Sequence, residues 1–400
     1  MMLSQRTKQI EESATLAMAQ KARQLIEQGI DVISLTLGEP DFPTPKHVKQ
    51  AAIQAIEAGL SDHYTNATGI MPLKQAIIDF HQTFDDVSYS VKDVVVGTGA
   101  KHILYVLFQT IIEKGDDVLI PTPYWVSYSE QVRLAGGQCL FVKTTIDTDY
   151  KVSVKQLDEA YTSNTKALIL NSPTNPTGSV YSKEELQEIG EWAVKHNVLI
   201  IADEIYYRLV YGNTQSICIA SLSERIQQNT VIINGLAKSF AMTGWRVGYA
   251  LSKREDIIYG MSQIISHETS NLTAVSQYAA LEALSGTQQV VEEMRRAFEQ
   301  RLNIFYDKIK TIPGFELAKP KGAFYLFPNI KNTLELTGYT SVNKFVEDLL
   351  EEAHVAVVSG DAFGDDECIR MSYAGDIERL LEAASRIRAF VEEKISQRES

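Results

Sequence analysis

Short runs of apolar residues alternate along this chain with longer stretches in which apolar and charged residues mix at helical spacing. Several of the runs lie about 30 residues apart, which is the length of a strand followed by a crossover helix. The runs are Val94–Val96, Val118–Ile120, Ala167–Leu170, Val198–Ile201 and Val231–Ile233. This rhythm predicts an α/β fold in which helices cover both faces of a mostly parallel central sheet.

Local signals mark where some helices begin and end. Thr44 followed by Pro45 is typical of an N-cap with proline in the first helical position, and Gly59 is typical of the end of that helix. Ser182 and Glu185 have the spacing of a capping box. We therefore expect one helix to start at Pro45 and another just after Ser182.

The pattern changes after residue 288. Apolar and charged residues between Gln289 and Lys310 predict one long helix that leaves the sheet. Strand-like runs at Ala323–Phe327 and Val355–Val358 follow, and then a charged helix to the end of the chain. The predicted parts are an amino-terminal arm that joins the small domain, a large domain and a small carboxy-terminal α+β domain, over residues 1–44, 45–288 and 289–400.

Composition supports a globular protein with room for two domains, since 44% of the 400 residues are hydrophobic and 22% are charged. The formal net charge is −13, and no cluster of lysine and arginine offsets it along the chain. A nucleic-acid partner is therefore not expected. Any anionic ligand must be bound in a local basic pocket.

The three cysteines, Cys139, Cys218 and Cys368, have neither the spacing of metal ligands nor an even count. We predict no metal site and no disulfide framework. The amino terminus lacks an apolar signal core, and no segment approaches the ~18 consecutive apolar residues of a membrane helix. These features predict a cytoplasmic protein without a membrane partner.

Polar residues follow the apolar runs directly, and the carboxyl ends of parallel strands meet at one edge of a sheet, where α/β proteins bind ligands. After the first run, Gly97-Thr98-Gly99-Ala100-Lys101 opens a helix whose free N–H groups suit a phosphate, although an ordinary tight turn can have the same residues. Lys101 opposes the helix dipole there. Its position favours a nearby anion unless the side chain simply extends into water.

The next three runs each deliver a side chain that suits a ligand. Trp125 can stack on a planar ring or pack in the core. Asn175, next to prolines, can point into a pocket or close a turn. Asp203 follows four apolar residues, and a carboxylate buried there needs a cationic partner such as a pyridinium nitrogen.

Lys238 comes shortly after the apolar run that ends at Ile233. A lysine amine that is partly removed from water loses some preference for the charged form and can condense with an aldehyde, although most lysines are exposed and have no such role. Arg246 is suited to a phosphate and Arg370 to a carboxylate. Either arginine taken alone is more often part of a surface ion pair.

Taken together, these residues resemble the fold type I, class I pyridoxal-phosphate aminotransferases, and most of all the bacterial-type aspartate aminotransferases. The resemblance covers nearly the whole chain. It rests on motifs in the same order: Ser13-Ala14-Thr15-Leu16, Leu37-Gly38-Glu39-Pro40-Asp41-Phe42, Tyr64-Thr65-Asn66-Ala67-Thr68-Gly69, Pro123-Tyr124-Trp125-Val126-Ser127-Tyr128, Asn175-Pro176-Thr177-Gly178, Asp203-Glu204-Ile205-Tyr206, the segment around Lys238, Gly322-Ala323-Phe324-Tyr325, and Arg370. It implies a homodimeric enzyme that acts on small-molecule amino acids and 2-oxo acids.

The resemblance also implies a role for each residue around pyridoxal 5′-phosphate. Lys238 would carry the cofactor as an internal aldimine and move the proton between the substrate Cα and the cofactor. Asp203 would pair with the pyridine nitrogen, and Trp125 would stack on the ring. Tyr206 and Asn175 would bond the phenolic oxygen of the ring.

For the phosphate, the resemblance implies contacts from Arg246, from the backbone of Gly99, Ala100 and Lys101, and from Tyr64 of the second subunit. Many relatives have serine three residues before the lysine, where this chain has Gly235. One phosphate hydrogen bond is therefore expected to be missing.

For the substrate, the resemblance implies that Arg370, Asn175 and the backbone of Gly38 bind the α-carboxylate beside Trp125. Lys101 would contact the distal carboxylate of aspartate or glutamate. Two hydroxyl residues, Ser13 and Thr15, would either assist that contact or cap a helix.

The implied reaction converts L-aspartate and 2-oxoglutarate to oxaloacetate and L-glutamate in two ping-pong half-reactions. The same fold also supports aromatic or broad-specificity aminotransferases and carbon–sulfur β-lyases. A non-catalytic cofactor-binding regulator is a further alternative. Such regulators are usually fused to a DNA-binding module, for which this chain has neither spare length nor a basic patch.

Overall fold

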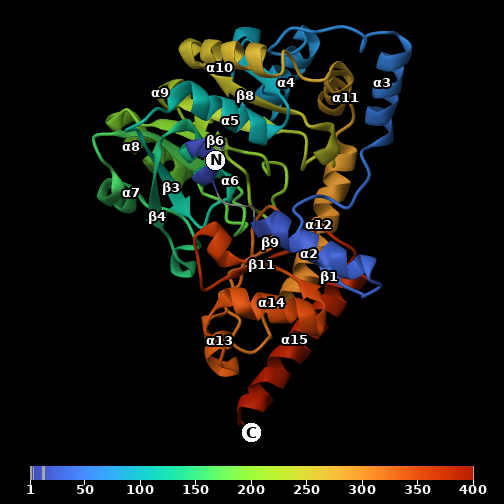
Figure 1. Ribbon diagram of the computed structural model, residues 1–400. Helices are drawn as coiled ribbons and strands as arrows, with labels where there is room; N and C mark the ends of the chain where they lie inside the picture. Colours follow the sequence, from blue (N-terminus) through green and yellow to red (C-terminus); the bar gives the residue numbers. More distant parts are fainter. Residues whose placement is uncertain (1, 3, 11–13, 400) are drawn as a thin grey trace.

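The computed structural model describes residues 2, 4–10 and 14–399. A seven-stranded sheet forms the upper part of the molecule in Figure 1, and two small sheets lie in the lower part. The large sheet has the strand order β2-β8-β7-β6-β5-β3-β4. In that order the strands are Val94–Gly97, Gly248–Ser252, Thr230–Gly235, Leu199–Asp203, Thr165–Asn171, Asp117–Thr122 and Gln138–Lys143. Within this sheet β8 runs in the opposite direction to the other six strands, so the predicted mostly parallel sheet is confirmed.

The five apolar runs became β2, β3, β5, β6 and β7, whereas the pattern gave no sign of β4 and β8. Strand β4 lies at the edge of the sheet, and of its six residues only Val142 is buried. An edge strand needs no continuous apolar run. No α-helix separates β7 from β8, and the two strands pair antiparallel, so β8 lies outside the strand-and-helix rhythm.

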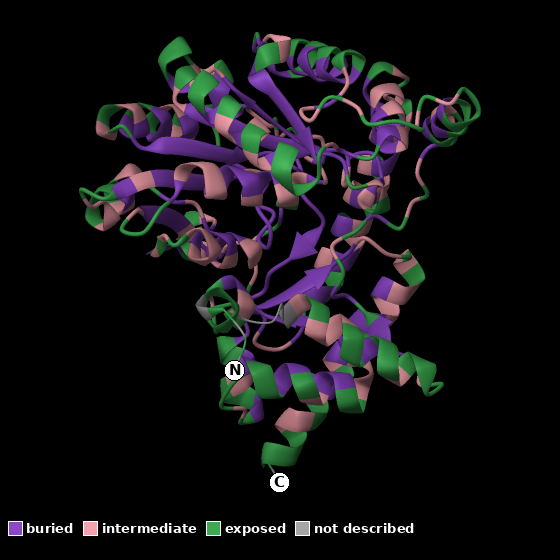
Figure 2. Ribbon diagram, turned by 45° about the horizontal axis from the view of Figure 1, so that its top comes forward, coloured by how far each residue is buried: buried purple, intermediate pink, exposed green. Residues whose placement is uncertain are grey.

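Helices cover both faces of the sheet, so its strands are buried (Figure 2). Successive side chains of a strand point to opposite faces. In β5, Ile169 packs toward one layer of helices, while Leu168 and Leu170 pack toward the other. The first layer comprises α5 (Ala100–Ile111), α6 (Ser127–Ala135) and α10 (Glu255–Glu268). The second comprises α7 (Val154–Ala160), α8 (Lys183–His196) and α9 (Glu224–Gln228). Three more helices, α3 (Lys46–Glu57), α4 (Met71–Asp85) and α11 (Ala274–Ser285), pack against β2 and β8.

The lower part joins the two ends of the chain, drawn in blue and red in Figure 1. Strand β1 (Ile33–Ser34) pairs in parallel with β10 (Val355–Ala356). A second small sheet has the order β11-β12-β9, with β11 at Val358–Ser359, β12 at Ile369–Ser372 and β9 at Tyr325–Leu326. The helices here are α2 (Ala14–Glu27), α12 (Gln289–Ile309), α13 (Lys331–Thr337), α14 (Val342–Ala353) and α15 (Ile377–Glu399). The four-residue helix α1 (Gln5–Lys8) lies by the N mark of Figure 1, at the height of the large sheet.

Two predicted strands of the lower part differ from the structure. The run Val355–Val358 is split between two sheets, because Ala356 pairs with β1 and Val358 pairs with β12. The run Ala323–Phe327 is shortened to the two residues of β9. Ala323 has a φ of 56°, so the backbone is left-handed there and cannot start an extended strand.

Two of the predicted helix starts are confirmed. Ser182 and Glu185 form the capping box at the start of α8, with the Ser182 N–H donating to Glu185 Oε2 at 2.7 Å. Helix α12 begins at Gln289 as predicted. The prediction for α3 was wrong by one residue, since Pro45 is the N-cap and the Thr44 hydroxyl instead donates to the Ala241 carbonyl at 2.7 Å. Among the described helices, none is both long and apolar enough to span a membrane.

Candidate active site

The predicted edge of the large sheet brings several of the candidate side chains together. Asn171 and Asp203 end neighbouring strands and are paired in register. Lys238 follows the end of β7 by three residues. Arg246 precedes the start of β8, and because β8 is antiparallel, its start lies at the same edge as the other strand ends. The convergence expected from parallel strands therefore occurs, with one antiparallel strand contributing to it.

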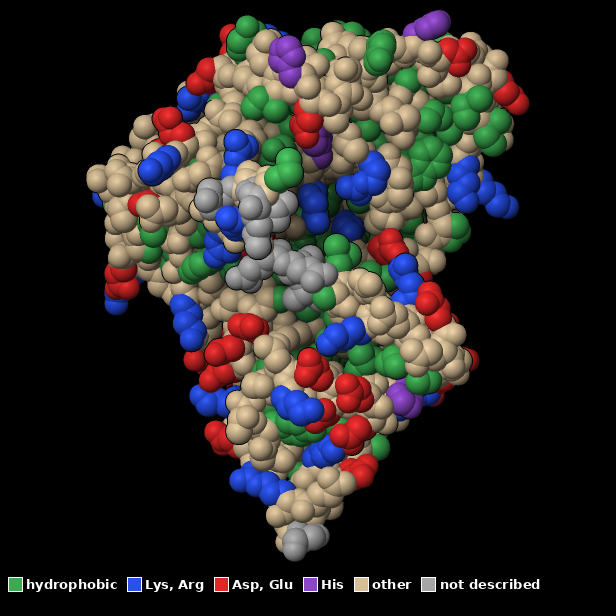
Figure 3. All heavy atoms as spheres, viewed as in Figure 1, with side chains coloured by type: hydrophobic (Ala, Val, Ile, Leu, Met, Phe, Trp, Pro, Cys, Tyr) green, Lys and Arg blue, Asp and Glu red, His purple; other side chains and the backbone are tan. Residues whose placement is uncertain are grey.

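This edge forms one wall of a pocket of about 340 Å³, and the lower part of the molecule forms the other. Figure 3 shows a hollow between the two parts with lysine or arginine side chains inside it. The lining residues are Thr15, Leu16, Leu37, Gly38, Ala100, Lys101, Trp125, Val126, Tyr128, Asn171, Asn175, Asp203, Ile205, Tyr206, Ala237, Lys238, Arg246, Tyr325 and Arg370. Most of the predicted site residues thus face one cavity.

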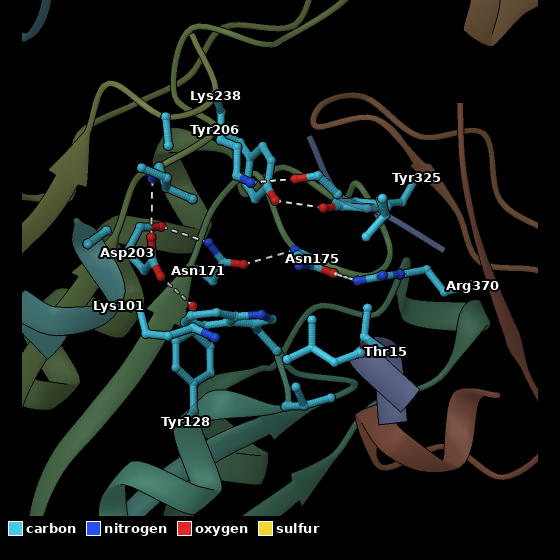
Figure 4. A pocket seen from close by; sticks show the side chains of 18 of the residues that line it. Thr15, Lys101, Tyr128, Asn171, Asn175, Asp203, Tyr206, Lys238, Tyr325 and Arg370 are labelled. Carbon is cyan, nitrogen blue, oxygen red and sulfur yellow. Dashed lines mark hydrogen bonds between the residues drawn. The ribbon is translucent and has the colours of Figure 1, made fainter. Parts of the chain in front are cut away.

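Asp203 is the acidic group of the pocket, and only 3% of its surface is exposed. Its Oδ2 accepts a hydrogen bond from the Tyr128 hydroxyl at 2.6 Å, and its Oδ1 accepts one from the Ile205 N–H at 3.1 Å (Figure 4). Burial raises the pKa of Asp203 to about 6, against the opposing effect of these two hydrogen bonds. A cationic partner in the pocket would offset that burial and hold Asp203 ionised.

Lys238 lies across the pocket, where its Nζ donates a hydrogen bond to the Gly38 carbonyl (Figure 4). Burial lowers the pKa of Lys238 to about 8. Glu39 opposes this change, while the positive charges of Arg370, Arg246 and Lys101 add to it. A lysine in this state has a substantial neutral, nucleophilic fraction near neutral pH.

Arg370 enters the pocket from β12 and has an exposed fraction of only 2%. Its guanidinium donates to Asn175 Oδ1 at 3.0 Å and to the Thr36 carbonyl at 2.7 Å, while its buried Nε has no partner in the described part of the chain. The Asn175 N–H in turn donates to Asn171 Oδ1 at 2.9 Å, and the Asn171 side chain donates to the Asp203 carbonyl at 2.8 Å. One chain of hydrogen bonds therefore links Arg370 to Asp203.

A second binding region lies at the start of α5. The N-cap Gly99 has a φ of 87°, and the N–H groups of Ala100 and Lys101 have no protein acceptor within the described residues. A Cβ added to Gly99 would lie 2.6 Å from a guanidinium nitrogen of Arg246, so that arginine lies directly against the turn. Free N–H groups beside an arginine are suited to an anion such as phosphate.

Lys101 completes the positive charge of the pocket. Its Nζ lies over the Trp125 ring, 4.9 Å from the centroid. Burial and the neighbouring Arg246 both lower its pKa. Among the described residues, no carboxylate forms an ion pair with any of the four cations of the pocket, Lys101, Lys238, Arg246 and Arg370. The pocket is therefore suited to a ligand that carries several negative charges.

The predicted residues at the margins of the site have varied positions. Thr15 lines the pocket, and Ser13 lies outside the described residues. Gly99 lies beneath Arg246 rather than on the pocket wall. Tyr64 is 89% exposed and does not line the pocket of its own chain. Gly235 has no room for a side chain, since a Cβ there would lie 2.7 Å from the Val247 carbonyl oxygen.

Three polar residues of the site had no role in the sequence-based prediction: Tyr128, Asn171 and Tyr325. Tyr128 lies three residues after Trp125 in the turn that enters α6, and helical spacing alone would have placed both on one face. Asn171 is a polar residue at the end of an apolar run, as Asp203 is. The Tyr325 hydroxyl lies 2.8 Å from that of Tyr206, and only the folding of the lower part onto the sheet brings them together.

A separate buried cluster comprises His81, Asp85 and Glu204, whose ligand atoms lie within 4.8 Å of one another. His81 Nδ1 is hydrogen-bonded to Asp85 at 2.5 Å, and Nε2 to the Tyr249 hydroxyl at 3.0 Å. Both ring nitrogens are therefore already engaged. We interpret this group as a hydrogen-bonded part of the core.

Comparisons with known proteins cover almost the whole chain. A sequence model described as "Aminotransferase class I and II" matches residues 30–387. The chain is 50% identical to an asparagine–oxo-acid transaminase of Streptococcus mutans and 48% identical to an aspartate aminotransferase of Bacillus sp. strain YM-2, in each case over 98% of this chain and 99% of the relative. The solved structure of the Thermus thermophilus aspartate aminotransferase with maleate superposes with a TM-score of 0.92 at 37% identity, over 97% of this chain and 99% of that one. The family resemblance and the fold class predicted from the sequence are confirmed.

The lowered pKa of Lys238 predicts selective reaction with aldehydes. When the ligand-free protein is treated with a small aldehyde and then with borohydride, labelling of Lys238 should rise about tenfold per pH unit up to about pH 8 and then level off. Ordinary surface lysines should continue to gain label up to about pH 10. Mass spectrometry of the digested protein measures both. Labelling of Lys238 that follows the surface lysines would contradict the assigned environment, and a Lys238→Ala variant controls for assignment of the peptide.

Proposed function

The chain belongs to the aminotransferase class I and II family and is an enzyme, and we propose that it transfers the amino group of L-aspartate to 2-oxoglutarate. The products are oxaloacetate and L-glutamate, formed in two half-reactions that use the same pocket in turn. The observation that carries this proposal is a buried arginine, Arg370, that faces the same pocket as Lys101, with no carboxylate paired to either among the described residues.

The cofactor that we propose for the pocket is pyridoxal 5′-phosphate. The chemistry of the residues fits it, since the free N–H groups at the start of α5 and Arg246 suit the phosphate, and the buried Asp203 suits a protonated ring nitrogen. When bound, the cofactor supplies an aldehyde carbon that amines attack and a pyridine ring that accepts electron density from the substrate. Lys238 would hold the aldehyde carbon covalently.

Lys238 has the environment of a group that also moves protons. Once the substrate amine has displaced it, its amine would remove the proton from Cα of the amino acid. A pKa near 8 suits this task, because neutral amine is available to accept the proton and the ammonium form can release it again. The Gly38 carbonyl accepts a hydrogen bond from Nζ and so restricts where the amine lies.

Asp203 would hold a proton on the ring nitrogen. Tyr128 and the Ile205 N–H fix the orientation of its carboxylate, so that its charge is already in position before the ligand arrives. Burial raises the pKa of Tyr206, which keeps its phenol protonated as a hydrogen-bond donor to the oxygen on the ring. Trp125 and Asn175 complete the proposed contacts, as a stacking surface and a polar neighbour.

The substrate would be held at both of its carboxylates. Arg370 and the backbone of Gly38 would bind the α-carboxylate, and Lys101 the distal one. The two cations lie on opposite sides of the pocket, as expected for a dicarboxylate, because Lys101 comes from the start of α5 and Arg370 from β12. The Thermus thermophilus relative solved with maleate, itself a dicarboxylate, supports this choice.

L-asparagine is a second candidate donor, because a relative 50% identical to this chain is an asparagine–oxo-acid transaminase. An amide in place of the distal carboxylate would leave the charge of Lys101 uncompensated, so the geometry favours aspartate. Aromatic amino acids and the β-elimination of a thiol are the alternatives within the same fold. Measured products distinguish all of these reactions.

We also propose that the enzyme works as a homodimer, in which the partner's Tyr64 reaches the phosphate region. Tyr64 is 89% exposed in the single chain. Large apolar side chains are also exposed in the segments that flank Tyr64 in the sequence, on α3, on the loop that follows and on α4, namely Ile53, Ile56, Leu60 and Met71. The division into a large domain of residues 45–288 and a small domain that closes over the substrate is part of the same proposal, and a cytoplasmic location stays a prediction.

Lys101→Ala should change the choice of substrate. We expect kcat/KM for L-aspartate to fall by about a hundredfold, because one carboxylate loses its charged partner in a partly buried site. The value for L-phenylalanine should change by about twofold or less, since its side chain makes no ion pair. Lys101→Arg, which keeps the charge, is the matched control. An equal loss for both substrates would assign Lys101 to the phosphate or to structure instead.

Asp203→Asn should slow the removal of the Cα proton. An amide cannot balance a pyridinium charge, so we expect the single-turnover rate with L-aspartate to fall by at least about a thousandfold. Tyr128→Phe keeps the carboxylate and removes one hydrogen bond to it, and should slow the same step by about tenfold. Stopped-flow absorbance with α-deuterated and ordinary aspartate measures both. An unchanged rate in Asp203→Asn would refute the proposed role.

A further inference from the structure

His102 lies in the first turn of α5, and its ring turns back toward the strand that precedes the helix. Its Nδ1 accepts a hydrogen bond from the Thr98 N–H at 3.1 Å. Its Nε2 lies 3.0 Å from Oε2 of Glu268, the last residue of α10. Because a backbone N–H can only donate, Nδ1 must be unprotonated, and the ring hydrogen lies on Nε2 and points at Glu268.

The ring fits tightly against the end of β2. A Cβ added to Gly97 would lie 2.8 Å from His102 Nδ1, so the ring reaches Thr98 only because residue 97 is glycine. The backbone N–H of His102 also donates to the Gly99 carbonyl at 3.0 Å. His102 therefore holds two successive residues of the turn, one through its ring and one through its backbone.

Another glycine restrains the same turn from the sheet. A Cβ added to Gly248, in β8, would lie 2.1 Å from the backbone nitrogen of Ala100. The turn is thus packed against β8, held by His102 at Thr98 and in contact with Arg246 at Gly99. Once Thr98 has an acceptor, the N–H groups still free at the start of α5 are those of Ala100 and Lys101.

We propose that His102 is a positioning residue for the phosphate of the cofactor. By accepting the Thr98 N–H while Glu268 holds the opposite side of its ring, it fixes the turn in the shape in which the N–H groups of Ala100 and Lys101 converge on one anion. Loss of the acceptor would leave the Thr98 N–H free and allow the turn to shift. The inference rests on the proposed function, because it takes the bound group to be pyridoxal 5′-phosphate.

Two substitutions each remove one of the two hydrogen bonds of the His102 ring and keep the other. His102→Asn places an amide oxygen where Nδ1 lies and keeps the acceptor for Thr98, but does not reach Glu268. His102→Gln places an amide nitrogen near the position of Nε2 and keeps the contact with Glu268, but loses the acceptor. His267→Gln, an exposed position on the same helix as Glu268, is the matched control.

The measurement is the dissociation constant of the cofactor-free protein for pyridoxal 5′-phosphate and for pyridoxal, which lacks the phosphate, followed by absorbance. We expect His102→Gln to weaken binding of the phosphorylated form by about tenfold and to leave binding of pyridoxal unchanged. His102→Asn, which loses only the contact with Glu268, should weaken binding of the phosphorylated form by no more than about threefold and leave pyridoxal binding unchanged. His267→Gln should stay within about twofold of the unmodified protein for both compounds. Circular dichroism of each variant reports whether it is folded.

Three results would overturn the proposal. In the first, His102→Gln keeps the preference of the unmodified protein for the phosphorylated form. In the second, His102→Asn is as weak as His102→Gln, which would show that keeping the acceptor for Thr98 does not preserve phosphate binding. In the third, the unmodified protein itself shows no preference for pyridoxal 5′-phosphate over pyridoxal, which would contradict the proposed cofactor as well.

A further variant keeps the test decisive if His102→Gln does not fold. Glu268→Ala removes the anchor of the ring without changing the turn. It should weaken binding of pyridoxal 5′-phosphate by about threefold and leave pyridoxal binding unchanged. Equal effects on both compounds, or none on either, would overturn the link from Glu268 through His102 to the phosphate.

Discussion

The pocket depends on one constraint, a buried positive charge that has no acidic partner among the residues that the structure describes. Arg370 lies between the rings of Tyr325 and Phe363, with centroids 4.6 and 4.7 Å from its guanidinium carbon, and its polar partners are neutral oxygens. Burying a charge without a counter-charge is costly, so the folded chain has a strong preference for an anion in this place. In the proposed function, the α-carboxylate of the substrate supplies this anion. The need to bind a carboxylate is thus present before any ligand enters.

The fold holds Arg370 in place by joining distant parts of the chain. Thr36, whose carbonyl accepts from Arg370, follows β1, and β1 pairs with β10 near the other end of the chain. The Leu35 carbonyl accepts from the N–H of Ser372, which is in the same strand as Arg370. Asn175 then connects Arg370 to the large sheet. The proposed substrate binding and the contact between the two parts of the molecule would therefore use the same residues, so occupancy of the site should also favour a closed arrangement.

The sequence predicted the large sheet and its edge well, because buried parallel strands are continuous apolar runs and their ends must converge. Asp203, Lys238 and Asn175 were found for that reason. The edge strand β4 and the two-residue strand β1 carry too little apolar pattern to be seen, whereas β9, β10 and β11 lie inside runs that were expected to form longer strands. The link between Tyr206 and Tyr325 and the packing of His102 against Gly97 depend on residues that meet only in the folded chain. Roles such as those of Lys101 and Tyr64 came from family resemblance and not from the pattern.

The half-reaction of the cofactor-loaded enzyme tests the central claim most directly. The enzyme is mixed with L-aspartate, L-asparagine, L-phenylalanine or L-cysteine and no oxo acid, and the cofactor absorbance and the products are followed. The account predicts that the absorbance changes fastest with aspartate and that one oxaloacetate is released per active site. A faster change with asparagine or phenylalanine, or release of pyruvate and sulfide from cysteine, would contradict it, as would no response to any of the four.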